Sequence, residues 1–156
     1  IVALAKGLAG GFPVGAVIAS ETVGKAMTPG THGSTFGGNP LAMAAAKAVL
    51  ETITARGFLA DVRRRAAYLD MGLCRLQAAY PQHITELRGC GFMRGIKMAE
   101  DNIDAITFVG KLRDHLVLSV PAAENTVRLL PPLIITTDEI DVLITALDKT
   151  LASLTP

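Results

Sequence analysis

A single lysine is the first candidate for chemistry in this chain. Lys6 follows an apolar run, residues 1–5, and precedes a glycine-rich turn, residues 7–13. A lysine amine can form an imine with a carbonyl compound once it has lost its proton, and removal from water at the end of a buried strand favours the neutral amine. A lysine at a strand–loop junction can equally cover apolar surface with its stem while its head group reaches water. Lys6 is therefore a candidate for imine chemistry that needs a second feature to support it.

That second feature is a loop with two adjacent hydroxyl groups. Ser34 and Thr35 lie within residues 33–38, where glycines leave backbone amides accessible, and a helix is predicted to begin at Asn39–Pro40. Hydroxyls, free amides and a helix N-terminus are the ingredients of a phosphate-binding loop, although the same composition fits an ordinary loop. Together with Lys6, the loop suggests one group that holds a cofactor covalently and another that holds its phosphate.

Other kinds of site are not supported by the sequence. Residues 89–95 are rich in glycine, but their spacing is wrong for a dinucleotide fingerprint and they lead into a strand. The three histidines share no ligand spacing, and no serine lies in a Gly-x-Ser-x-Gly turn. Cys74 and Cys90 lie far apart without a zinc-binding pattern, so we expect reduced thiols, no metal and a cytoplasmic location.

Composition narrows the range of partners. Half of the 156 residues are hydrophobic and the mean hydropathy is +0.41, yet no apolar run approaches the roughly 18 residues that cross a bilayer. The 15 basic and 14 acidic residues are spread along the chain, which argues against nucleic acid or membrane as a partner. The chain opens on Ile1 within a predicted strand, so we expect a piece of a longer protein.

The elements that must position these residues can be read from hydrophobic periodicity. Residues 1–20 predict a strand, a glycine-rich loop and a second strand, followed by a short helical or irregular stretch to Gly30. An alanine-rich helix is predicted to run to about Thr54, with a smooth surface suited to close packing. The break at Arg56–Gly57 places a domain boundary near residue 56.

Beyond that break, helices are predicted to cover one face of a small sheet. A long amphipathic helix carries its apolar stripe over residues 58–76, and a closing helix follows a Thr136-x-x-Glu139 capping box. Between them we predict strands at 84–87, 91–98, 117–120 and 127–130, and a helix over about 102–115.

Three stretches resemble a known family. Residues 5–16 and 32–40, supported by Val127-Arg128-Leu129-Leu130-Pro131-Pro132-Leu133, are similar to the class III aminotransferases of fold type I, which depend on pyridoxal phosphate. The resemblance covers essentially the whole chain. It implies an α/β fold in which residues 1–56 form the C-terminal end of the large cofactor-binding domain and residues 57–156 the small C-terminal α+β domain.

The resemblance also implies roles for four residues. Lys6 would link to pyridoxal phosphate and move a proton as general base and acid. Thr35 would bind the cofactor phosphate, in the family from the neighbouring subunit of a dimer, and Ser34 would touch an acylated amino acid. Arg128 would bind a substrate carboxylate through its planar guanidinium, although it could instead pair with a nearby acid beside the Pro-Pro turn.

The activity implied is transfer of the terminal amino group of N-acetylornithine to 2-oxoglutarate in arginine biosynthesis, by a cytoplasmic homodimer with shared active sites. Ornithine, succinylornithine or 4-aminobutyrate are alternative substrates. A second alternative is an inert fragment that serves as a folding or dimerisation piece. It stays open because the family's aspartate at the pyridine nitrogen, stacking aromatic ring, main phosphate loop and second arginine have no counterpart in this chain.

Overall fold

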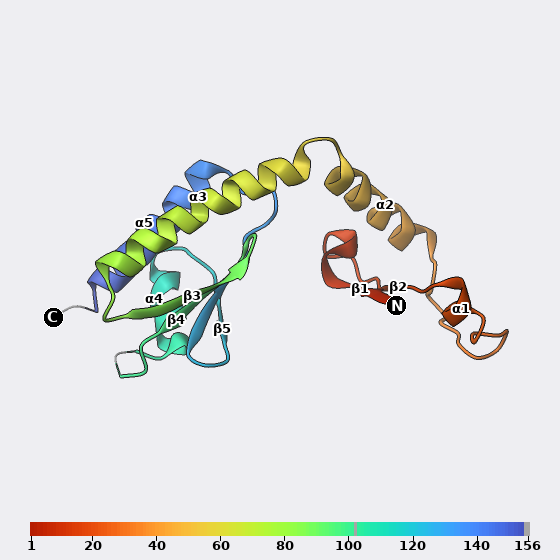
Figure 1. Ribbon diagram of the computed structural model, residues 1–156, viewed down its shortest axis with the longest axis horizontal. Helices are drawn as coiled ribbons and strands as arrows, with labels where there is room; N and C mark the ends of the chain where they lie inside the picture. Colours follow the sequence, from red (N-terminus) through yellow and green to blue (C-terminus); the bar gives the residue numbers. More distant parts are fainter. Residues whose placement is uncertain (102, 155–156) are drawn as a thin grey trace. The chain divides into compact units, whose positions relative to one another are not determined.

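The computed structural model describes residues 1–101 and 103–154. The chain divides into two compact units, residues 1–59 and residues 60–156, which are described separately below (Figure 1). The division falls close to the break expected near residue 56. The assignment of the two parts to a large and a small domain remains a prediction.

The first unit opens with two short antiparallel strands. β1 (Val2–Leu4) pairs with β2 (Ala16–Ile18) so that Ala3 lies opposite Val17. Between them the glycine-rich loop forms a 3₁₀ turn, η1 (Lys6–Ala9), and a short helix, α1 (Glu21–Gly24), follows the second strand. The structure therefore has the predicted order of strand, loop and strand, with a turn of helix inside the loop.

The alanine-rich helix α2 (Pro40–Thr54) begins as predicted. The Asn39 side-chain oxygen accepts a hydrogen bond of 2.9 Å from the backbone N–H of Ala42, which caps the first turn. Ala42 is buried, and α2 packs on η1. At this contact Gly10 has a φ of 63°, and a Cβ there would lie 3.3 Å from Val49 Cγ2. The alanine-rich helix thus packs against the turn that contains Lys6.

One expectation about this unit is wrong. The strand before Lys6 is not buried within residues 1–59, because every residue of β1 and β2 is exposed, including Val2 at 52% and Val17 at 70%. The physical reason is that two strands of three residues have two apolar faces to cover, while α2 packs on η1. Lys6 accordingly has an exposed side chain in this unit.

In its described residues, the second unit contains a four-stranded antiparallel sheet and three helices. The strands lie in the order β3 (Ile84–Cys90), β4 (Met93–Met98), β6 (Thr126–Leu129) and β5 (Val120–Ala122). The helices are α3 (Phe58–Ala79), α4 (Ala105–Asp114) and α5 (Thr137–Ala152). All three helices were predicted within a few residues of these bounds.

Side chains along the central strands β4 and β6 alternate between a buried face and an open face of the sheet. Ile96 of β4 lies opposite Val127 of β6, and both side chains are buried. Their neighbours Gly95 and Arg128 also lie opposite each other, but on the other face, because successive residues of a strand point to opposite sides. The buried face joins a core whose largest fully buried members include Leu69, Leu73, Phe108, Leu112, Ile140 and Leu147. The helices supply most of that core, and the opposite face carries polar residues.

Helices α3 and α5 pack closely on each other. A Cβ on Gly72 would lie 2.7 Å from Ile144 Cδ1, so only glycine fits at this contact without a shift. The Tyr68 hydroxyl donates a hydrogen bond of 2.8 Å to Asp141, which raises the pKa of Tyr68. Tyr80 makes the same contact with Asp148 further along.

The capping box before α5 is confirmed. Thr136 accepts a hydrogen bond from the Glu139 backbone N–H, and the Glu139 carboxylate accepts one of 2.7 Å from the Thr136 backbone N–H. The latter bond, with that from the Thr136 hydroxyl, lowers the pKa of Glu139. This interaction therefore stabilises the fold above the ordinary pKa of a glutamate and is lost as the pH falls through the lowered value.

Several elements differ from prediction in their bounds, since β3 continues to Cys90 and β4 begins only at Met93. The strand expected at 117–120 is β5 (Val120–Ala122), which contains Pro121; a proline is tolerated there because β5 lies at the edge of the sheet. Helix α4 begins at Ala105, and Asp104 accepts the capping hydrogen bond from the Thr107 backbone at 2.9 Å. Asn102, the expected start, lies outside the described residues.

We expect Gly89→Ala to destabilise the protein by at least about 2 kcal/mol. Gly89 has a φ of 117°, and a Cβ there would lie 2.0 Å from the backbone oxygen of Met93. Gly110→Ala is the matched control, because a Cβ there meets nothing within 4 Å in the middle of α4 and alanine favours helix. Urea unfolding of both variants followed by circular dichroism gives the free energies of unfolding. Equal stability of the two variants would contradict the steric account.

Candidate active site

Lys6 stands at a strained backbone position. Ala5 is extended, with φ −160°, and the chain then reverses at Lys6, whose φ is 55° in the left-handed region that favours glycine. The turn is held by a hydrogen bond of 3.2 Å from the Leu8 backbone N–H to the Ala5 carbonyl. Backbone strain of this kind concentrates at functional sites, where the surrounding structure maintains it.

The Lys6 amine is available for chemistry. It makes no hydrogen bond or ion pair with any residue that the structure describes, and its side chain is exposed. Lys25 and Lys47, also in this unit, each form an ion pair with a glutamate one helical turn away. Lys6 therefore presents an unpaired primary amine from a fixed turn.

The hydroxyl loop is a chain of tight turns leading into α2. The Gly37 backbone N–H donates to the Ser34 carbonyl at 3.3 Å, and the Asn39 backbone N–H donates to the Phe36 carbonyl at the same distance. A Cβ on Gly37 would lie 3.1 Å from Ser34 Cβ, so a small residue suits this position. The Ser34 and Thr35 hydroxyls have no hydrogen-bond partner within residues 1–101 and 103–154. Both remain free to bind a ligand oxygen.

The structure places these candidates in different surroundings. Ser34 lines a hollow of about 250 Å³ in the first unit, together with residues 13–15 of the first glycine-rich loop and the start of α2. Lys6 and Thr35 are not among its lining residues. The hollow thus joins the two glycine-rich loops, while the amine and the second hydroxyl lie outside it.

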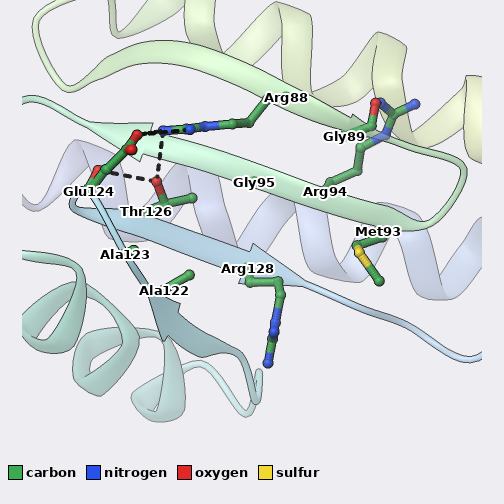
Figure 2. A pocket seen from close by; sticks show the side chains of 10 residues that line it. All are labelled: Arg88, Gly89, Met93, Arg94, Gly95, Ala122, Ala123, Glu124, Thr126 and Arg128. Atoms are coloured by element: carbon green, nitrogen blue, oxygen red, sulfur yellow. Dashed lines mark hydrogen bonds and ion pairs between the residues drawn. The ribbon is translucent and has the colours of Figure 1, made fainter. Parts of the chain in front are cut away.

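Arg128 lies on the open face of the sheet in the second unit. It is exposed on β6, and its guanidinium has no ion-pair or hydrogen-bond partner among the described residues. The alternative in which Arg128 pairs with a nearby acid is therefore not what the structure shows. Arg128 lines a hollow of about 320 Å³ on this face, and its side chain points away from the other charged groups there (Figure 2).

Two further arginines line this hollow, Arg88 and Arg94, and neither was predicted; Arg94 forms an ion pair with Asp70. Both terminal nitrogens of Arg88 lie 3.0 Å from Glu124 Oε2, and Nη2 also donates to the Thr126 hydroxyl at 3.2 Å (Figure 2). The hydrogen bonds and charge of Arg88 lower the pKa of Glu124. A signal for part of this group was present in the sequence, since Thr126 and Arg128 follow the two-residue period that places side chains on one face of a strand.

Other kinds of site are not found in the described part of the chain. No cluster of histidine, cysteine or acidic residues there could hold a metal ion. Cys74 and Cys90 are free thiols. No helix within residues 1–101 and 103–154 has the length and apolar character needed to cross a membrane.

Comparison with known proteins decides the family. The family model for class-III aminotransferases matches residues 1–151. The chain belongs to the class-III aminotransferases. The family resemblance expected from the sequence is confirmed, as is the pyridoxal-phosphate-dependent transferase fold. Class III aminotransferases are enzymes that depend on pyridoxal phosphate.

Curated class-III relatives are called acetylornithine aminotransferases. That of Mesorhizobium japonicum is 46% identical over 140 residues, which is 90% of this chain and 34% of the relative. That of Streptococcus mutans is 49% identical over 142 residues, covering 90% of this chain and 36% of the relative. The chain thus spans about a third of the length of the curated relatives it matches.

Solved class-III structures agree with the fold. The ornithine δ-aminotransferase of Plasmodium falciparum has a TM-score of 0.89 at 29% identity, over 97% of this chain and 40% of that one. The acetylornithine aminotransferase of Elizabethkingia anophelis has a TM-score of 0.86 at 31% identity, over 97% and 38% of the two chains. An ornithine aminotransferase of Toxoplasma gondii, with a TM-score of 0.87 at 34% identity over 97% and 36% of the chains, is described with partial occupancy of pyridoxal phosphate at its active site.

The residues in this chain fit such a cofactor. An unpaired amine suits its aldehyde, and the free Ser34 and Thr35 hydroxyls beside the N-terminus of a fifteen-residue helix suit its phosphate. The unpaired guanidinium of Arg128 suits a substrate carboxylate. These residues carry the three functional groups that binding of the cofactor and an amino-acid substrate requires.

Proposed function

We propose that the complete protein transfers the terminal amino group of N-acetylornithine to 2-oxoglutarate with pyridoxal phosphate as cofactor. The observation that carries the proposal is the unpaired amine of Lys6, presented from a strained turn in a chain that matches the class-III family. Acetylornithine aminotransferases among the relatives support the substrate. This activity belongs to arginine biosynthesis and fits a cytoplasmic enzyme.

Each residue has a definite task in this proposal. Bound pyridoxal phosphate supplies an electron sink for the bond that breaks at the substrate carbon. The Lys6 amine would hold the cofactor, and would then take the proton from the substrate carbon that bears the amino group and deliver it to the cofactor carbon to which the lysine had been linked. The Thr35 hydroxyl donates to a phosphate oxygen, Ser34 contacts the acyl amino acid, and Arg128 binds a carboxylate through two parallel hydrogen bonds.

The proposal includes a homodimer with shared active sites, in which Thr35 serves the partner subunit's cofactor. The support within this chain is that Thr35 does not line the hollow that Ser34 lines, and that its hydroxyl is exposed without a partner in the described residues. Residues 1–56 would form the end of the large domain and residues 57–156 the small domain. A size measurement showing a monomeric holoenzyme would contradict the shared site.

A second candidate keeps the chemistry and changes the substrate to ornithine. It is favoured by the solved ornithine aminotransferases that share the fold at TM-scores up to 0.89. The curated relatives compared above, at 46% and 49% identity, favour the acylated substrate, since both are called acetylornithine aminotransferases. Acetylated ornithine is therefore the first choice.

A substrate panel separates these candidates. We expect the complete protein, loaded with pyridoxal phosphate and supplied with 2-oxoglutarate, to show its highest kcat/KM with N-acetylornithine. Ornithine, succinylornithine and 4-aminobutyrate are the competitors. A preference for an unacylated amine would overturn the proposed substrate, and no transamination of any of the four would overturn the proposed class of activity in favour of an inert piece.

Thr35→Val should weaken cofactor retention by about 10- to 100-fold, the range for one hydrogen bond to a charged group. Valine keeps the approximate shape and removes only the hydroxyl, so the fold should be unaffected. The measurement is the dissociation constant for pyridoxal phosphate, followed by cofactor absorbance after dialysis. Thr28→Val, at an exposed position in the same unit, is the matched control, and equal affinity of the two variants would refute the phosphate role of Thr35.

A further inference from the structure

The open face of the sheet places two arginines in one cross-strand row. Arg88 of β3 lies opposite Gly95 of β4, and Gly95 lies opposite Arg128 of β6. Residues directly opposite each other point to the same side of a sheet, so both guanidinium groups lie on the open face. The two arginines differ in one respect: both terminal nitrogens of Arg88 bind Glu124, whereas Arg128 has no partner among the described residues.

Gly95 makes room for this arrangement. A Cβ on Gly95 would lie 3.0 Å from Thr126 Cγ2 and 3.2 Å from Arg88 Cγ. The φ of Gly95 is not positive, so the backbone does not require glycine here. Glycine is suited to this position because it has no side chain to crowd Thr126 and Arg88. The Arg88 stem lies across that gap and reaches Glu124 and Thr126 beyond it (Figure 2).

Glu124 is the acid that could otherwise compete for Arg128. It lies in the turn between β5 and β6 and lines the same hollow as Arg128. Its φ of 57° is unusual for a residue other than glycine, asparagine or aspartate. The turn is fixed next to it by Asn125, whose side chain accepts from the Ala105 backbone at 2.6 Å and donates to the Ile103 carbonyl at 3.0 Å. A carboxylate is thus held close to the hollow where a substrate carboxylate would bind.

We propose that Arg88 is a positioning residue that binds the Glu124 carboxylate and thereby leaves Arg128, which has no partner among the described residues, ready for a substrate carboxylate. The inference rests on the proposed function of Arg128 and deepens it. Glu124 is 65% exposed, so its ion pair with Arg88 adds little to stability. The role of Arg88 is to keep the Glu124 carboxylate from binding Arg128 in place of a substrate carboxylate.

The test uses the complete holoenzyme and 2-oxoglutarate as the carboxylate probe. Arg88→Met keeps the stem over Gly95 and removes the guanidinium. We expect the KM for 2-oxoglutarate to rise roughly fivefold while kcat changes less than about twofold, in the range of an exposed charge interaction. Glu86→Gln is the matched control and should leave the KM unchanged, because Glu86 approaches Arg88 only at 3.9 Å.

In Arg88→Met the Glu124 carboxylate has lost its arginine partner. Neutralising that carboxylate should reverse the rise in KM for 2-oxoglutarate. The double variant Arg88→Met, Glu124→Gln should return the KM to within about twofold of the wild type, and the defect of the single variant should shrink as salt is raised from about 0.05 to 0.5 M. A purely structural role of Arg88 predicts neither rescue nor salt dependence. An unchanged KM in Arg88→Met, or failure of the rescue, overturns the inference alone. A wild-type enzyme that does not use 2-oxoglutarate overturns the proposed function, and this inference with it.

Discussion

Lys6→Ala should reduce transamination by the complete enzyme at least about 1,000-fold, because one side chain both holds the cofactor and moves the proton, and proton transfer alone contributes 10²- to 10⁴-fold. Alanine keeps the Cβ, so the strain at φ 55° stays the same and the change isolates the amine. The measurement is kcat/KM with N-acetylornithine and 2-oxoglutarate.

Lys25→Ala is the control for the lysine substitution. Lys25 lies in the same unit, has a side chain 73% exposed and forms only an ion pair with Glu21 of its own helical turn. Loss of the Lys25 side chain should leave kcat/KM within about twofold of the wild type, since exposed ion pairs of this kind contribute little. Residual activity of Lys6→Ala above about one tenth of the wild type would refute the catalytic assignment.

Arg128→Leu should lower kcat/KM for carboxylate substrates by at least about 30-fold, corresponding to about 2 kcal/mol, the lower end of the cost of truncating one partner of a hydrogen-bonded charge pair. Leucine keeps the apolar part of the side chain on the open face and removes the fork that binds a carboxylate. The loss should appear mainly in KM if the arginine binds substrate and transition state equally.

Two further variants sharpen the test of Arg128. Arg128→Lys should recover only part of the loss, because an ammonium group cannot make two parallel hydrogen bonds to a carboxylate. Arg113→Leu, on the exposed last turn of α4, should have no effect on KM. If Arg128→Leu and Arg113→Leu have the same kinetics, Arg128 does not bind the substrate.

Elements with strong local signals were predictable from the sequence. The start of α2 follows from Asn39 and Pro40, and the start of α5 from Thr136 and Glu139, because a helix cap is formed by residues within one turn of each other. The catalytic candidate Lys6 was found because it is framed by an apolar run and a glycine-rich turn, but its left-handed backbone has no signature in the residue type.

Features that depend on contacts between distant segments were not predictable. The edge position of β5 decides whether Pro121 fits in a strand, and that position depends on pairing with β6. The hollow beside Arg128 likewise depends on a register that places Arg88 opposite Gly95, and no local pattern encodes that register. The exposure of β1 and β2 was missed because an apolar strand looks the same in sequence whether or not another layer covers it.

The central claim is that Lys6 forms the covalent link to pyridoxal phosphate. The direct measurement is reduction of the complete holoenzyme with borohydride, followed by digestion and mass spectrometry of the labelled peptide. The account predicts a single pyridoxyl-phosphate label on Lys6, with disappearance of the cofactor's imine absorbance on reduction. A label on any other lysine, or no label while transamination proceeds, would contradict it.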